Sequence, residues 1–191
     1  MTEHVKLPLW LRVFYLVFGV AIVGFALIVF INIPLVFIDE ILILGIAIAA
    51  VSIPRLLSGL FDKRLTKSLK IFNIIVGLLI LPAGIIAIIW TTLDFLILID
   101  ILALAIMMIG ILGILQGVED KSKVRIYRIV VNLIGFILIG LAATVLIMDS
   151  MFTNLVLVSL LSTCLLIIGL RRLVEGIVDY RIFKQPEQSS Y

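Results

Sequence analysis

Residues 69–90 read LKIFNIIVGLLILPAGIIAIIW, a run of 22 residues whose one charge is that of Lys70. An α-helix rises 1.5 Å per residue, so roughly 17 to 25 apolar residues cross a hydrocarbon layer of ~30 Å. Similar runs recur along the chain, and the expected membrane-spanning helices are residues 10–31, 41–57, 69–90, 95–115, 126–147 and 154–170. The sequence therefore predicts an all-α polytopic membrane protein with six transmembrane helices.

The composition of the chain agrees with this prediction. Of its 191 residues, 64% are hydrophobic and 14% are charged, and the mean hydropathy is +1.38. A soluble domain is only about half apolar. The runs are also too uniformly apolar for the alternating pattern of a transmembrane barrel. We expect a single transmembrane domain over residues 1–191, with a short cytoplasmic tail at 182–191.

A polar segment precedes the quoted run and recurs along the chain. It reads GLFDKR at 59–64, GVEDKS at 117–122 and GIVDYR at 176–181. Repeats of 20 to 60 residues usually mean stacked copies of one supersecondary unit. The period of about 58 residues therefore predicts three tandem helical hairpins.

The openings of the three hairpins align as well, and they fix the expected limits of each copy. They read LRVFYLVFG at 11–19, LKIFNIIVG at 69–77 and VRIYRIVVN at 124–132, so the copies span approximately 10–62, 69–120 and 124–179. In this alignment Asn132 replaces Gly19 and Gly77, and the third copy is about four residues longer than the others. Because each copy crosses the membrane twice, we expect a pseudo-threefold arrangement about an axis along the membrane normal.

The charges are segregated between the two sides of this six-helix arrangement. All 15 Lys and Arg residues and seven of the 12 acids fall on one side, giving +8, while the other side carries five acids and no base. Short loops rich in Lys and Arg remain in the cytoplasm. The sequence predicts a multi-pass protein of a prokaryotic plasma membrane, with both termini in the cytoplasm.

The basic side forms a candidate surface for anionic lipids. The residues expected to form it are Lys63, Arg64, Lys67, Lys121 and Lys123. Each such residue near a membrane attracts anionic headgroups by roughly 1 kcal/mol. The simpler interpretation is a topology signal and nothing more. The pI near 9.2 does not indicate nucleic-acid binding, because the basic residues follow the membrane topology.

Four polar residues within the apolar runs form a candidate intramembrane site: Asp100, Asn73, Asn132 and Gln116. A carboxylate deep in a bilayer would mark a proton or ion pathway. Asp100 could equally lie at the interface, with the hydrocarbon span starting at Ile101. The amides could hydrogen-bond between helices and fix their packing, or coordinate a solute.

Two further features concern packing at the basic side. Gly113 and Gly117 form a small-xxx-small motif, which predicts close helix packing between hairpins or an oligomer contact. Arg171 and Glu175 are four residues apart and are expected to form an exposed pair that contributes little to stability.

Hydroxyl side chains within the expected helices can hydrogen-bond to a backbone carbonyl of the preceding turn. We expect such bonds for Ser159, Ser162, Thr163 and Thr144.

Residues for enzyme chemistry are scarce. The chain has one histidine, His4, and one cysteine, Cys164. One of each allows no histidine-based metal site, no nucleophile and histidine pair and no intramolecular disulfide. Phosphate-binding glycine loops and metalloprotease motifs are absent from the sequence. We expect no catalytic residues, no metal, no cofactor and no enzyme activity.

The repeat pattern resembles the HdeD-type short-repeat membrane family over about residues 10–180. The resemblance lies in Trp10-Leu11-Arg12 with Phe18-Gly19, in Pro34 and Trp90 at the outer turns, and in the closing glycines Gly59, Gly117 and Gly176. It implies a six-helix inner-membrane protein, associated in some bacteria with acid resistance, without known catalytic residues.

Two functions follow as hypotheses. The first is a non-enzymatic helical bundle of the plasma membrane, which assists stress tolerance or scaffolds other membrane components. Its partners would be the lipid bilayer, another membrane protein or a second copy of itself. The alternative is a pathway for a small solute or for protons, with Asp100 as its buried acid.

Overall fold

The structure is a computed structural model that describes residues 9–32, 37–62, 65–89, 95–119, 125–148 and 154–177. The elements in these ranges are α-helices, namely α1 (Leu9–Asn32), α2 (Phe37–Phe61), α3 (Lys67–Ile89), α4 (Phe95–Glu119), α5 (Arg125–Met148) and α6 (Asn154–Ile177). Each is long and apolar enough to cross a membrane. The prediction of an all-α fold with six membrane-spanning helices is confirmed.

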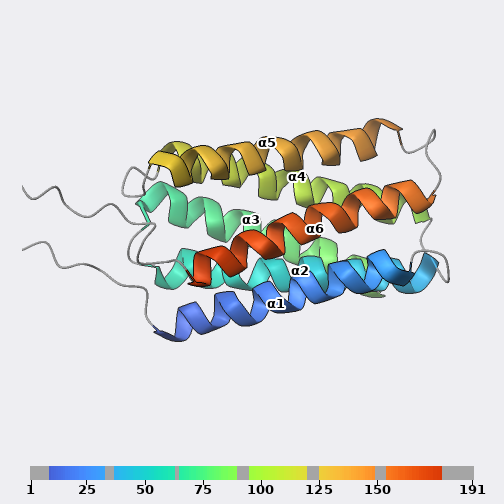
Figure 1. Ribbon diagram of the computed structural model, residues 1–191, viewed down its shortest axis with the longest axis horizontal. Helices are drawn as coiled ribbons and strands as arrows, with labels where there is room; N and C mark the ends of the chain where they lie inside the picture. Colours follow the sequence, from blue (N-terminus) through green and yellow to red (C-terminus); the bar gives the residue numbers. More distant parts are fainter. Residues whose placement is uncertain are drawn as a thin grey trace, which may run out of the picture.

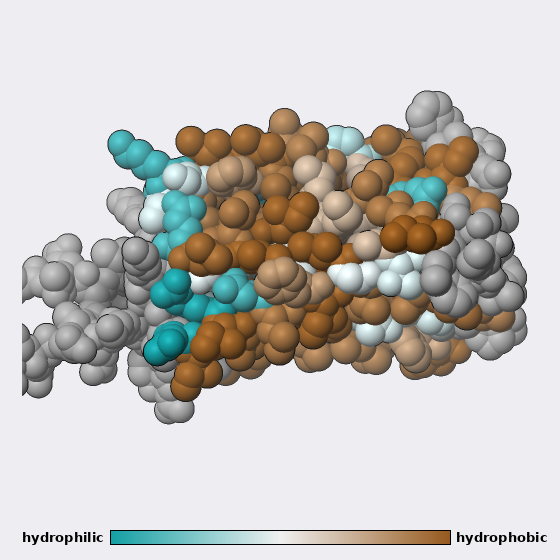
Figure 2. Space-filling model, turned by 90° about the horizontal axis from the view of Figure 1, so that it is seen from above, coloured by the Kyte–Doolittle hydropathy of each residue, from teal (hydrophilic) through white to brown (hydrophobic). Residues whose placement is uncertain are grey.

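Consecutive helices run in opposite directions along the long axis of the bundle (Figure 1). The N-termini of α1, α3 and α5 therefore lie at the same end as the C-termini of α2, α4 and α6. We call it the basic end, because it holds all the described Lys and Arg residues: Arg12, Arg55, Lys67, Lys70, Arg125, Arg128, Arg171 and Arg172. Hydrophilic residues gather at this end, while apolar residues cover most of the length of the bundle (Figure 2).

The helices form a central and an outer group. α2, α4 and α6 contact one another, and each outer helix contacts two of them: α1 lies on α6 and α2, α3 on α2 and α4, and α5 on α4 and α6. The most extensive contacts are α2 with α3, α4 with α5 and α6 with α1. These pairs join successive hairpins, so the largest interfaces lie between the predicted copies and not within them.

Apolar side chains fill the space between the central helices. Fully buried members of one contiguous cluster come from all three: Leu44 and Ile48 of α2, Leu102 and Ile106 of α4, and Leu161 and Leu165 of α6. Large apolar side chains of the outer helices, such as Val20, Leu78 and Phe136, are exposed. Exposed apolar residues at these positions fit contact with lipid chains.

Glycines bring the backbones of paired helices into close contact. A Cβ atom added to Gly84 of α3 would lie 2.7 Å from the backbone nitrogen of Ala49 and 2.8 Å from the carbonyl oxygen of Gly45, both in α2. In the same way, a Cβ on Gly135 of α5 would lie 2.8 Å from the carbonyl oxygen of Gly110 in α4. Small residues are needed here, because helices in lipid associate through van der Waals packing.

These contacts correct the expected alignment of the third copy. A Cβ on Gly19 would meet Leu173, one on Gly77 would meet Leu56, and one on Gly135 would meet Ile114. Each contacted residue lies three positions before a closing glycine. Gly135, and not Asn132, is therefore the counterpart of Gly19 and Gly77.

The closing glycines give the same correspondence. A Cβ on Gly59 would lie 2.9 Å from the carbonyl oxygen of Lys70, and one on Gly117 would lie 2.9 Å from that of Arg128. Arg128, and not Arg125, thus takes the position of Lys70 in these contacts, one helical turn later than the alignment expects. Counted from Arg128 to its closing glycine, the predicted third copy would be about one residue longer than the others instead of about four. The pseudo-threefold symmetry of the whole bundle stays a prediction.

The glycine contact between α2 and α3 can be tested with Gly84→Ala. The added methyl group meets backbone atoms, which cannot rotate away, so we expect a loss of about 1 to 3 kcal/mol in the free energy of unfolding. Gly24→Ala and Gly140→Ala are matched controls, because a Cβ at either position meets nothing within 4 Å. Thermal unfolding in detergent would measure all three, and a Gly84 variant as stable as the controls would contradict the tight contact.

Candidate functional site

A chain of hydrogen bonds joins three helices at the basic end. Arg171 of α6 donates from Nη2 to Oε1 of Gln116 in α4 at 2.6 Å, and Gln116 donates from Nε2 to Oδ1 of Asn73 in α3 at 3.3 Å. Asn73 is fully buried and donates to the carbonyl oxygen of Leu69 at 2.8 Å. The structure thus brings together two of the four predicted intramembrane polar residues, Asn73 and Gln116.

Glu175 of α6 connects this chain to a second set of donors. Its Oε1 accepts from Tyr127 at 2.8 Å and from Nε of Arg171 at 3.0 Å, and its Oε2 accepts from Nη1 of Arg172 at 3.0 Å. The side chains of Arg171 and Glu175 are 8% and 12% exposed. The predicted pair exists, but the expectation that it is exposed is wrong, because α6 turns it toward α4 and α5.

The polar residues occupy equivalent positions in the three central helices. The position four residues before the closing glycine is occupied by Arg55 in α2, Gly113 in α4 and Arg172 in α6. The position one residue before that glycine is occupied by Ser58, Gln116 and Glu175, respectively. Residues three apart lie on the same face of a helix. Since α2, α4 and α6 contact one another, these positions converge at the basic end of the bundle interior.

Gly113 is part of this arrangement. A Cβ on Gly113 would lie 2.9 Å from Nη1 of Arg171, whereas the nearest atom of α5 would be 3.7 Å away. Gly113 therefore leaves space for the guanidinium group of Arg171. Gly117, the second residue of the predicted packing motif, lies directly against Asn132 and the backbone of α5.

Arg55 is the most unusual member of the cluster. Its side chain comes from the interior of α2 and the residue is 2% exposed. Within the described part of the chain, its Nε and Nη1 atoms have no hydrogen-bond acceptor. The guanidinium group of nearby Arg172 lies over the ring of buried Tyr15, 5.2 Å from its centroid. The cluster thus holds a buried cation whose donors are not all used.

The other predicted polar residues lie apart from the cluster. Asp100 precedes Gln116 by sixteen residues on α4, which places it roughly 24 Å away along the helix. Asn132 lies on the outer helix α5, with its Oδ1 atom buried against Gly117 and without a hydrogen-bond donor among the described residues. The four predicted residues do not form one site.

The predicted basic surface lies mostly outside the described residues. Lys67 is exposed at the start of α3, while Lys63, Arg64, Lys121 and Lys123 fall in segments that the structure does not describe. Arg128 was not among the predicted surface residues. It donates to the carbonyl oxygens of Gly117 and Val118, each at 2.8 Å, and so binds the end of α4.

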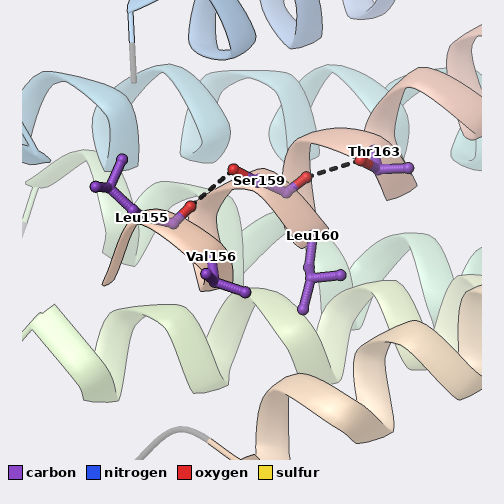
Figure 3. A pocket seen from close by; sticks show the side chains of 5 residues that line it. All are labelled: Leu155, Val156, Ser159, Leu160 and Thr163. Atoms are coloured by element: carbon purple, nitrogen blue, oxygen red, sulfur yellow. Dashed lines mark hydrogen bonds between the residues drawn. The ribbon is translucent and has the colours of Figure 1, made fainter. Parts of the chain in front are cut away.

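A surface pocket on α6 contains two of the hydroxyl residues (Figure 3). It is lined by Leu155, Val156, Ser159, Leu160 and Thr163. Ser159 and Thr163 donate to backbone carbonyls one turn earlier, at 2.7 and 2.8 Å, as predicted. Both hydroxyl protons are thereby used within α6, so the pocket presents a mostly apolar lining in which the two hydroxyl oxygens can act only as acceptors.

Ser162 differs from the other hydroxyl residues. It donates to the carbonyl oxygen of Ala26 in α1 at 2.7 Å and so joins two helices. The expectation of a bond within its own helix is wrong here, because Ser162 is fully buried at the contact between α1 and α6.

Sequence reasoning assigned no site role to Arg55, Arg172, Tyr15 or Tyr127. A signal was present, because Arg55 and Arg172 stand four residues before a closing glycine and thus inside their helices. By sequence, both count among the bases of the cytoplasmic side, because Arg55 falls near the end of the expected helix 41–57 and Arg172 falls just beyond the expected end at residue 170.

The described residues contain no group of three His, Cys, Asp or Glu side chains that could hold a metal ion. Comparison of the chain with protein-family models, with curated proteins and with solved structures finds no match. The fold and the site define a multi-pass helical membrane protein with a buried, arginine-rich polar cluster at one end.

The role of Glu175 can be tested with Glu175→Gln. Removing this charge leaves Arg171 and Arg172 buried without their carboxylate, and breaking a buried pair in this way costs about 3 to 5 kcal/mol. Tyr127→Phe removes a single hydrogen bond and should cost about 1 kcal/mol. Glu119→Gln is the control, because Glu119 accepts an exposed hydrogen bond from Thr66. Equal losses of unfolding free energy in all three variants would contradict the role of Glu175.

Proposed function

We propose that the protein is a non-enzymatic helical bundle of a prokaryotic plasma membrane, which scaffolds other membrane components and supports stress tolerance. The observation that carries this proposal is the apolar filling between α2, α4 and α6. The resemblance to the HdeD-type family, which is associated with acid resistance, gives the proposal its physiological direction.

The arrangement of polar residues argues against the alternative, a proton or solute pathway. Such a pathway needs polar groups that follow one another across the membrane. Here Asn73 and Gln116 belong to the basic end, and Asp100 lies roughly 24 Å farther along α4. Leu102, Ile106 and Ile109, between Asp100 and Gln116, are at most 1% exposed. The described side chains that lie between Asp100 and Gln116 along α4 are therefore apolar and provide no polar path for protons.

Proton flux distinguishes the two functions. We expect liposomes that contain the protein to dissipate an imposed pH gradient at the rate of empty liposomes, and Asp100→Asn to leave that rate unchanged. A protonophore added at the end shows that the gradient was intact. Flux above that of empty liposomes, abolished by Asp100→Asn, would replace the scaffold function with a proton pathway.

The proposed orientation has its own test. Because Lys and Arg residues hold short loops in the cytoplasm, we expect a C-terminal green fluorescent protein fusion to be fluorescent and a C-terminal alkaline phosphatase fusion to be inactive in bacterial cells. The opposite pattern would place the basic end outside. Fusion of the same reporters after α5 serves as the matched control with the reverse expectation.

A further inference from the structure

We propose that Arg55, together with Arg171 and Arg172, binds an oxyanion of the phosphate class inside the basic end of the bundle. The ion would be either free phosphate or the phosphate of a lipid headgroup. This proposal is independent of the scaffold function.

The first argument is the unused hydrogen-bonding capacity of Arg55. Guanidinium groups are always charged, and burying such a cation without a partner costs several kcal/mol. The charge of Glu175 acts on Arg55, but the hydrogen bonds that its carboxylate accepts come from Arg171, Arg172 and Tyr127. Nε and Nη1 of Arg55 are buried and have no acceptor among the described residues.

The second argument is the excess of positive charge. The charges of Arg172, Arg171 and Glu175 all act on Arg55. Asp62 is also buried and acts on Tyr15 at the edge of the cluster. Three cations thus face two described anions. Like charges repel strongly where water is excluded, so a bound anion would relieve this repulsion.

The chemistry of the donors selects the class of anion. Guanidinium groups bind phosphate through charge-assisted hydrogen bonds, and Arg is the preferred residue wherever phosphate is recognised in this way. A tetrahedral oxyanion has enough acceptors to serve Nε and Nη1 of Arg55 and a neighbouring guanidinium group together.

The location allows either source of phosphate. Arg55 and Arg171 each stand six residues before the end of their helix, about 9 Å from the end of the bundle. The aqueous phase and the lipid headgroups meet the protein at this end.

The test compares thermal unfolding of the full chain in dodecyl maltoside micelles, a detergent without phosphate. Inorganic phosphate is titrated in one arm, phosphatidylglycerol is added in a second, and sodium chloride of equal ionic strength is the control. We expect the unfolding midpoint to rise by about 3 °C or more at a ligand concentration tenfold above the dissociation constant. A rise with phosphate alone assigns the free ion, and a rise with the lipid alone assigns the headgroup.

The variant Arg55→Met ties the effect to this site. It removes a buried cation without an acceptor, so without ligand it should unfold no lower than wild type, and its ligand-dependent rise should be lost. Arg125→Met is the matched control, because Arg125 is exposed in the first turn of α5 and its loss should leave the rise intact.

Three results would overturn the proposal. The first is an equal midpoint in wild type with phosphate, with the lipid and with sodium chloride. The second is a ligand-dependent rise that Arg55→Met retains. The third is an Arg55→Met variant that unfolds well below wild type without ligand, since Arg55 would then already be compensated within the protein. The wild-type comparison decides the first point even if the variant does not fold.

Discussion

The close backbone approach at the glycine contacts is the constraint on which the rest of the bundle depends. Lipid chains are as apolar as the helices, so burying leucine or isoleucine between helices gains little by itself. Gly45 with Gly84 and Gly110 with Gly135 allow the backbones of neighbouring helices to touch. The helices then gain dispersion contacts that lipid cannot equal. This is why the most extensive interfaces form where glycines of successive hairpins meet.

The same close packing explains where polar side chains occur. Along most of the bundle the central helices leave room only for apolar side chains. At the basic end, Gly113 provides the space that the guanidinium group of Arg171 occupies, and the network of Glu175, Gln116 and Asn73 satisfies neighbouring donors and acceptors. Glycine thus has two roles in α4, as a contact between backbones and as a recess for a charged side chain.

The spans were predictable because the length of an apolar run is a local property of the sequence. Their limits were less predictable at the basic end, where α2 continues to Phe61 and α6 to Ile177 instead of residues 57 and 170. Both helices continue through polar residues that lie in the bundle interior, Arg55 in α2 and Arg171, Arg172 and Glu175 in α6, and a sequence cannot show that in advance. The apolar runs also could not show that Arg171 and Glu175 are buried, or that Asp100 is remote from Asn73 and Gln116. These facts depend on how helices from different hairpins meet. The same holds for the register of α5, in which Gly135 takes the place expected for Asn132.

The contact between α6 and α1 gives the chain a circular order. Each hairpin presents its second helix to the first helix of the next, and the last hairpin presents α6 to α1 in the same way. A circularly permuted chain, with its natural termini joined and a new opening between α2 and α3, would therefore keep every helix interface. It would lose only the loop that was cut. A fourth hairpin, or a second molecule, finds no unused surface of this kind. Assembly with another protein would use the ends of the bundle or its outward surfaces, which include exposed apolar residues of α4 and α6 such as Leu104 and Val156 as well as those of α1, α3 and α5.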